Sequence, residues 1–222
     1  MLRTASHTPL AGFTIVELLI SILLTSIIMG AIYSVYRVQT HTAKVQEMRQ
    51  EAQEYARSAL DMMVREIRNA GYKPVAVATH ITLPPCDDGT NKGVYTATAT
   101  KFEFRYDIDA DGDCGETNER IIYEYNAASK NITRAAAPDA PPDVSVPQSL
   151  TDGNVTSFSF RYFKQDGAEL TILPVPAADL PNIQRVLITL TVQSKNPDAQ
   201  FGGQLNAQMS SNADLRNRGL PQ

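Results

Sequence analysis

The sequence contains few of the residues from which catalytic or nucleic-acid sites are usually built. Among 222 residues there is no tryptophan, and there are only three histidines and two cysteines. Lys and Arg number 20 against 24 Asp and Glu, so the net charge is −4. A strong nucleic-acid binder usually carries a basic excess, so we expect no nucleic-acid partner. No G-x-S-x-G, P-loop, H-E-x-x-H or C-x-x-C pattern occurs, and we therefore expect a protein that is not an enzyme and requires no cofactor.

The apolar residues near the N-terminus are gathered into a single run. Residues 13–36 read FTIVELLISILLTSIIMGAIYSVY and carry one charge, that of Glu17. A helix of about 20 residues crosses a bilayer core of about 30 Å, so this run is long enough to span a membrane. Residues 1–12, which precede it, form a short polar leader with Arg3 and no acidic residue.

Three interpretations of this run remain open from its residues. A removable secretory signal would have the basic start, the apolar centre and the small residues at Gly30 and Ala31, but an acid such as Glu17 is unusual in one. An ordinary membrane anchor gains nothing from Glu17, whose charge costs about 2.5–3.5 kcal/mol at the bilayer centre. In the third interpretation Glu17 has a cationic partner, because a buried carboxylate is tolerated when a cation pairs with it.

The residues around Glu17 resemble the processing site of type IV pilins and type II secretion pseudopilins. The match covers the length of the leader, Gly12, Phe13, Glu17 and the apolar run that follows. The resemblance implies that a membrane peptidase cuts between Gly12 and Phe13 and that the new amine of Phe13 is methylated. It also implies that Glu17 neutralises the N-terminal amine of a neighbouring subunit in a filament.

The helix is predicted to continue well beyond the apolar run. Residues 37–70 contain no proline and no glycine, and their apolar side chains recur at spacings of three and four, which defines one helical stripe. The stripe consists of Met48, Ala52, Tyr55, Ala59, Leu60, Met63, Val64 and Ile67. Gly71 follows as the preferred helix stop, so we expect one helix of roughly 55–60 residues, about 85 Å long. The stripe is expected to pack on the chain's own globular part, with a coiled coil to another protein as the alternative.

The remainder of the chain alternates in polarity as β-strands do. Strands are predicted at residues 100–106, 120–125, 157–162 and 186–193, with a weaker one within 205–215, and surface loops at 135–147 and 174–182. The predicted fold class is α+β, with a long N-terminal helix packed on an antiparallel β-sheet domain, as in pilins. The predicted divisions are the leader 1–12, the membrane or filament-core half 13–36, the amphipathic half 37–71 and the globular domain 72–222.

The two cysteines, Cys86 and Cys114, are predicted to form a disulfide. A single pair in a chain whose body lies beyond a membrane favours this pairing. Such a bond would stabilise the fold by about 3–4 kcal/mol in the chain-entropy model. Two unrelated buried thiols are the alternative.

An acidic segment is a candidate calcium site. Four aspartates alternate along it, and Gly112 lies among them where a sharp bend would be needed. The spacing to the next glutamates does not fit an EF-hand, and strands rather than helices are expected on both sides. The candidate ligands are Asp107, Asp109, Asp111 and Asp113, with Glu116 or Glu119 completing the shell. A solvated acidic turn is the alternative.

Two short segments resemble a narrower group within the pilin and pseudopilin family. Residues 68–72 (RNAGY) and 215–218 (LRNR) resemble the helix end and the chain end of PilW-type minor pilins, and the first also resembles J-type pseudopilins. The implied protein is a single-pass inner-membrane prepilin with a periplasmic domain that later enters a surface pilus. The implied partners are other minor pilins, the major pilin, the prepilin peptidase, the assembly platform and, before assembly, the membrane. The alternatives are a J-like pseudopilin of type II secretion and a membrane-anchored extracytoplasmic binding module or adhesin.

Overall fold

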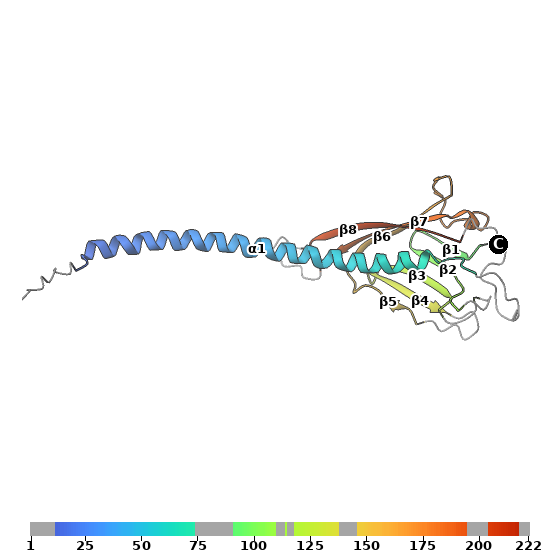
Figure 1. The fold of residues 1–222 in the computed structure, drawn as a ribbon, viewed down its shortest axis with the longest axis horizontal. Helices are drawn as coiled ribbons and strands as arrows, with labels where there is room; N and C mark the ends of the chain where they lie inside the picture. Colours follow the sequence, from blue (N-terminus) through green and yellow to red (C-terminus); the bar gives the residue numbers. More distant parts are fainter. Residues whose placement is uncertain are drawn as a thin grey trace, which may run out of the picture. The chain divides into compact units, whose positions relative to one another are not determined.

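The computed structural model describes residues 12–73, 91–109, 114, 118–137, 146–194 and 204–217. It contains one long helix, α1 (Ile15–Ile67), followed by antiparallel strands (Figure 1). The predicted α+β class is therefore confirmed. The chain divides into two compact units, residues 1–46 and residues 47–222, and α1 contributes to both.

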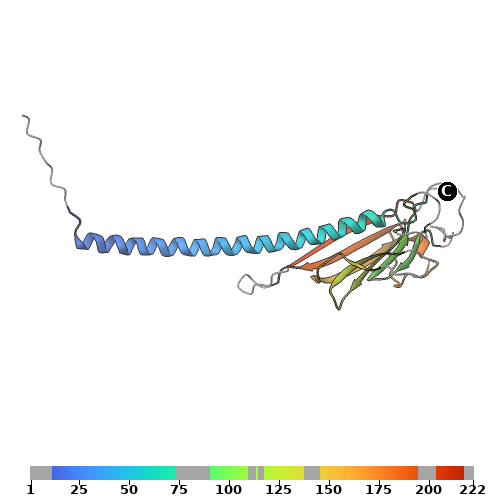
Figure 2. The same cartoon turned by 90° about the horizontal axis from the view of Figure 1, so that it is seen from below.

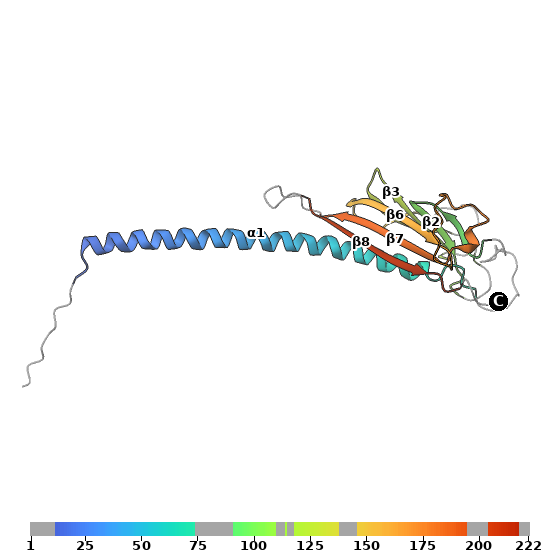
Figure 3. The same ribbon diagram turned by 90° about the horizontal axis from the view of Figure 1, so that it is seen from above.

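The strands form two antiparallel sheets within the second unit. The first has five strands in sequence order: β1 (Val94–Ala97), β2 (Lys101–Arg105), β3 (Arg120–Asn126), β4 (Asn131–Ala137) and β5 (Gln148–Ser149). The second has three: β6 (Val155–Phe163), β7 (Arg185–Gln193) and β8 (Asn206–Asp214), with the short 3-10 helix η1 (Leu180–Asn182) before β7. Figure 3 shows β6, β7 and β8 side by side.

The sheets are joined where β6 passes the turn between β1 and β2. The Phe160 N–H donates to the Ala99 carbonyl at 2.8 Å, and the Tyr162 hydroxyl donates to the Thr98 carbonyl at 2.7 Å. The Phe102 ring packs against both Phe160 and Tyr162, with ring centroids 5.8 and 5.6 Å away. Aromatic side chains from both sheets therefore meet in one core.

The second half of α1 supplies the remaining wall of this core (Figure 2). All members of the predicted stripe are buried except Tyr55, which is partly buried, and Ala56 joins them. The stripe thus packs on the chain's own sheets, as expected. The helix ends at Ile67, and residues 68–71 form turns. Gly71, the last of them, adopts a φ of +73°, and its N–H donates to the Arg105 carbonyl at 2.8 Å.

Strand prediction was partly wrong. Strands β1, β4 and β5 were not predicted, and residues 135–137, assigned to a loop, are the end of β4. The sequence of β4, NITRAAA, combines one β-branched pair with three alanines, so its own strand preference is weak. It forms a strand because it pairs with β3 along seven residues, from Asn131 to Ala137.

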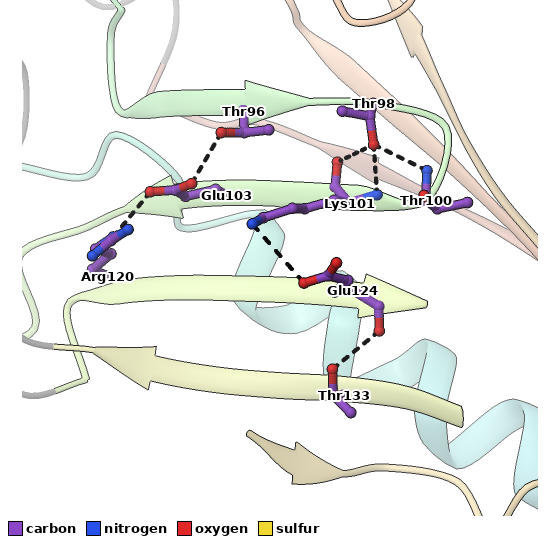
Figure 4. A network of polar contacts seen from close by, with 8 residues as sticks. All are labelled: Thr96, Thr98, Thr100, Lys101, Glu103, Arg120, Glu124 and Thr133. Atoms are coloured by element: carbon purple, nitrogen blue, oxygen red, sulfur yellow. Dashed lines mark hydrogen bonds and ion pairs between the residues drawn. The ribbon is translucent and has the colours of Figure 1, made fainter. Parts of the chain in front are cut away.

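The face of the five-stranded sheet turned away from α1 is polar (Figure 4). Glu103 of β2 accepts hydrogen bonds from the Thr96 hydroxyl at 2.9 Å and from Arg120 Nε at 2.9 Å. Further along β2 and β3, Lys101 Nζ lies 3.9 Å from Glu124 Oε2. These cross-strand pairs support the antiparallel register of β1, β2 and β3 on the polar face, while Phe102 and Phe104 face the core.

Candidate functional site at the start of α1

The residues predicted to be processed lie just outside the helix. Gly12, Phe13 and Thr14 are not helical, and α1 begins at Ile15. The Thr14 hydroxyl oxygen accepts the Glu17 N–H at 3.2 Å, and the Thr14 carbonyl accepts the Leu18 N–H at 3.2 Å. Thr14 is therefore the N-cap of α1. The Phe13 side chain is 81% exposed, so the Gly12–Phe13 peptide lies in an accessible, non-helical segment.

The first part of α1 presents apolar side chains on every side. From Phe13 to Val38, all large apolar side chains are more than half exposed within the chain. By length and composition, α1 includes one stretch that could cross a membrane, and none of it is buried in the part of the chain that the structure describes. An apolar surface of this extent needs lipid or another protein to cover it.

The hydroxyl groups in this apolar part are satisfied within the helix. Ser21, Thr25 and Ser26 donate to the carbonyls four residues earlier at 2.7–2.8 Å. Ser34 donates to the Ala31 carbonyl at 2.8 Å. Since a hydroxyl bonded to its own backbone costs little in an apolar medium, these residues leave the helix surface effectively apolar.

Glu17 is the exception among these polar groups. Its carboxylate makes no hydrogen bond or ion pair with any residue that the structure describes. It follows Thr14 by three residues, the spacing at which a glutamate often returns a bond to the cap, yet the described contacts include only the bond from the Glu17 N–H to Thr14. Gly12, Phe13 and Glu17 thus lie together at one end of α1, and the exposed Glu17 carboxylate stands among exposed apolar side chains.

The acidic segment is only partly described. The carboxylate oxygens of Asp107, Asp109 and Glu119 all lie within 4.8 Å of one another. Asp107 is 1% exposed and Glu119 is fully buried. Glu119 Oε1 also accepts the Ile108 N–H at 3.2 Å, which ties the two ends of the segment together. Asp111, Asp113 and Glu116 lie outside the described residues. The calcium site therefore stays a prediction, with three of its carboxylates within ligand distance of one centre.

The predicted disulfide also falls partly outside the described residues. Cys114 is fully buried, next to the acidic segment. Cys86 lies in the segment that the structure does not describe. The pairing of Cys86 with Cys114 stays a prediction.

A junction between α1 and the five-stranded sheet was not found from the sequence. Glu66 Oε2 accepts the Tyr123 hydroxyl at 2.6 Å and Arg134 Nε at 2.9 Å. Burial and the Glu66 carboxylate raise the pKa of Tyr123. Burial opposes the charge of Arg134, but the hydrogen bond and charge of Glu66 outweigh it and raise the pKa of the guanidinium. The junction therefore fixes the end of α1 to β3 and β4 and carries no chemistry of its own.

Comparison with known proteins assigns the larger part of the chain to one family of sequences. The sequence profile described as prepilin peptidase-dependent protein B (PpdB) matches residues 45–211, about three quarters of the chain. This range holds the amphipathic half of α1 and the sheets, and it leaves out Gly12, Phe13 and Glu17. A type IV-like pilin from Thermus thermophilus is similar in structure, at 12% identity and a TM-score of 0.46, over 75% of this chain and 96% of that one. No curated protein sequence matches.

Proposed function

The chain belongs to the prepilin peptidase-dependent protein B family, and from this we propose that it is a minor pilin of the PilW type. The family is one of pilin-like structural components, so the protein is not an enzyme. A membrane peptidase cuts between Gly12 and Phe13, and the new amine receives a methyl group. The mature chain then enters a type IV pilus or the tip complex that initiates one.

The observation that carries this proposal is the unsatisfied carboxylate of Glu17. Every Ser and Thr hydroxyl from Ser21 to Ser34 has an acceptor in its own helix, whereas Glu17 has no partner among the described residues. An ionised carboxylate in apolar surroundings is costly unless a cation pairs with it. The nearest cation that processing creates is the amine of Phe13, and a staggered neighbouring subunit brings its own amine to this level.

The face of α1 next to Glu17 supports packing of a second helix, because small side chains lie along it. The residues of this face are Leu18, Ser21, Ile22, Thr25, Ser26 and Met29. Small side chains let two helix backbones approach closely in an apolar medium, where packing rather than hydrophobicity drives association. We infer that the second helix is the apolar helix of another pilin-family subunit, because its free amine complements the charge of Glu17.

The location and partners follow from the same mechanism. Before assembly the apolar half of α1 anchors the chain in the inner membrane, with the β-sheet unit in the periplasm. After assembly the same surface is covered by neighbouring helices. The partners are the prepilin peptidase, the assembly platform, the major pilin and other minor pilins.

The mass of the mature N-terminus tests the proposal. The full chain is isolated from membranes of cells that carry the prepilin peptidase and from a strain that lacks it, and its N-terminal peptide is measured by mass spectrometry. The expected peptide begins with N-methylated Phe13 and appears only when the peptidase is present. A chain that begins at Met1 in both strains, or after Ala31, overturns the proposal in favour of a membrane-anchored binding module.

A second measurement separates the two machines that use this chemistry. Deletion of the gene is scored for surface fibres and for exported enzymes in the same strain. Loss of fibres with normal export is expected for a minor pilin. Loss of export with normal fibres would instead assign the chain to the J-like pseudopilins.

A further inference from the structure

We propose that Thr14 is a positioning residue for cleavage, because its cap holds the Gly12–Phe13 peptide bond outside α1. This inference rests on the proposed function, since it concerns the same processing reaction. In that reaction water adds across the amide, which leaves a carboxylate on Gly12 and an amine on Phe13. Thr14 does not take part in this step. Its contribution is to set where the helix begins.

The geometry at the start of α1 supports this role. The bond from the Glu17 N–H to the Thr14 hydroxyl and the first backbone bond, from the Leu18 N–H to the Thr14 carbonyl, both converge on Thr14. The two residues of the scissile bond come immediately before it and are not helical. A Cβ placed on Gly12 would meet no atom of the residues that the structure describes within 4 Å, so this part of the chain does not shield the backbone from an enzyme.

The position of the helix start matters because a protease binds its substrate in an extended form. A peptide bond inside a helix has its N–H and carbonyl committed to the helix, and it must open before it can be cut. With the start at Ile15 this opening is unnecessary. Proteolysis in general favours exposed segments that are free of regular structure.

Without the cap, the helix is expected to lengthen rather than fray. Unpaired N–H groups at the start of α1 lie beside an apolar stretch, where an unsatisfied backbone group costs several kcal/mol. Extension by nearly two turns moves these groups into the polar leader. The sequence offers a new start there, because Thr8 followed by Pro9 has the form of an N-cap with proline at the first helical position. The scissile bond would then lie inside the helix.

The test compares cleavage rates of the full chain in membranes that contain the prepilin peptidase. Thr14→Val keeps the shape of the side chain but cannot cap, whereas Thr14→Ser and Thr14→Asn can cap as well as threonine. Thr42→Val is the matched control, because the Thr42 hydroxyl bonds the Val38 carbonyl within the helix and has no part in the cap. Thr14→Val is expected to be cut roughly fivefold more slowly, while the other three variants are cut at the rate of the unchanged chain.

A second measurement reports the helix start directly. Hydrogen exchange of the Gly12 and Phe13 amides is followed in the full chain in detergent micelles. Exchange is expected to be fast in the unchanged chain and clearly slower in Thr14→Val. The inference therefore does not depend on cleavage alone.

Each other outcome overturns the inference. Cleavage of Thr14→Val at the unchanged rate shows that the cap is irrelevant. Slow cleavage of Thr14→Ser and Thr14→Asn shows that the peptidase reads the threonine side chain itself. An unchanged chain that is never cut between Gly12 and Phe13 overturns the proposed function as well, which distinguishes that failure from the first two.

Discussion

Glu66 on the last turn of α1 and Arg134 on β4 lie 68 residues apart in sequence and form an ion pair with an N–O distance of 2.9 Å. Their side chains are only 18% and 14% exposed. Tyr123 of β3 donates its hydroxyl to the same carboxylate. The Glu66 carboxylate therefore holds the helix against two strands. Its removal would leave the Arg134 guanidinium and the Tyr123 hydroxyl without this acceptor in a largely buried position.

The first prediction concerns the stability of this junction. Glu66→Ala is expected to lower the free energy of unfolding by about 2–3 kcal/mol, because breaking a largely buried pair strands the remaining charge. The control is Glu124→Ala, which removes the exposed pair with Lys101 and should cost under about 1 kcal/mol. Urea denaturation of the full chain in detergent measures both. Equal effects of the two substitutions would contradict a special role for Glu66.

The second prediction concerns alkaline pH. Burial raises the pKa of Tyr106, Tyr123 and Tyr162, with the Glu66 carboxylate adding to the first two. Because the unfolded chain releases these protons near the ordinary value of about 10 while the folded chain retains them, their contribution is complete below about pH 10 and is lost as the pH rises further. Between the pKa of the unfolded chain and that of the folded chain, each such tyrosine lowers the free energy of unfolding by about 1.4 kcal/mol per pH unit.

The test of this slope is a variant that lacks one of the tyrosines. Tyr162→Phe should show a shallower loss of unfolding free energy between pH 10 and 11 than the unchanged chain. The interval from pH 7 to 9 serves as the internal control, since neither chain should lose stability through these groups there. An unaltered slope above pH 10 would show that Tyr162 does not hold its proton in the folded state.

The sequence predicted the helix and those strands whose conformation depends mainly on residues near them in the chain. The stripe from Met48 to Ile67 depends on helical periodicity, and Gly71, which adopts positive φ, marks the end of the helical pattern to within four residues of Ile67. Strands β2, β3, β6, β7 and β8 alternate or are rich in branched and aromatic residues, and each overlaps a predicted range. The site proposed at the start of α1 also rests on a local signal, because its residues are close together in the sequence, and its processing stays a prediction.

Features that depend on distant partners were not predicted. Nothing distinguishes Glu66 from the other charges of α1 until β3 and β4 bring Tyr123 and Arg134 beside it. Strand β4 is similar, because its alanines pair with β3 rather than follow a strand preference of their own. The division of the strands into two sheets also follows from long-range pairing that the alternation along one strand does not encode.

The third prediction concerns calcium at the acidic segment. Asp107 and Glu119 are buried and lie close to Asp109, and carboxylates that are close together and shielded from water repel unless a cation joins them. If calcium binds with a dissociation constant of about 1 mM, 10 mM calcium should add about 1.4 kcal/mol. The melting temperature of the full chain should then rise by roughly 3–5 °C relative to the chelated chain.

Two substitutions separate this site from a general effect of the ion. Asp109→Ala should abolish the difference between calcium and chelator. Asp166→Ala removes an aspartate from the turn after β6, whose carboxylate accepts the Ala168 N–H, and should leave the difference intact. Equal melting temperatures of the unchanged chain with calcium and with chelator would show that the acidic segment does not bind calcium.

The last prediction concerns the charge of Glu17 during assembly. Glu17→Ala should enter the membrane at least as well as the unchanged chain, because it removes a charge that costs energy in an apolar medium. Its recruitment into filaments should fall at least tenfold, because the amine of the neighbouring subunit loses its counter-ion and is left as an uncompensated charge. Ser34→Ala is the matched control: its hydroxyl bonds the Ala31 carbonyl within the same apolar run, and it lies outside the face proposed to pack on a neighbouring subunit, so recruitment should not change. Quantitative immunoblots of membrane and sheared-filament fractions measure both steps. Normal recruitment of Glu17→Ala, with equal amounts in the membrane, would show that the carboxylate does not pair with an amine and that packing of the apolar helices suffices.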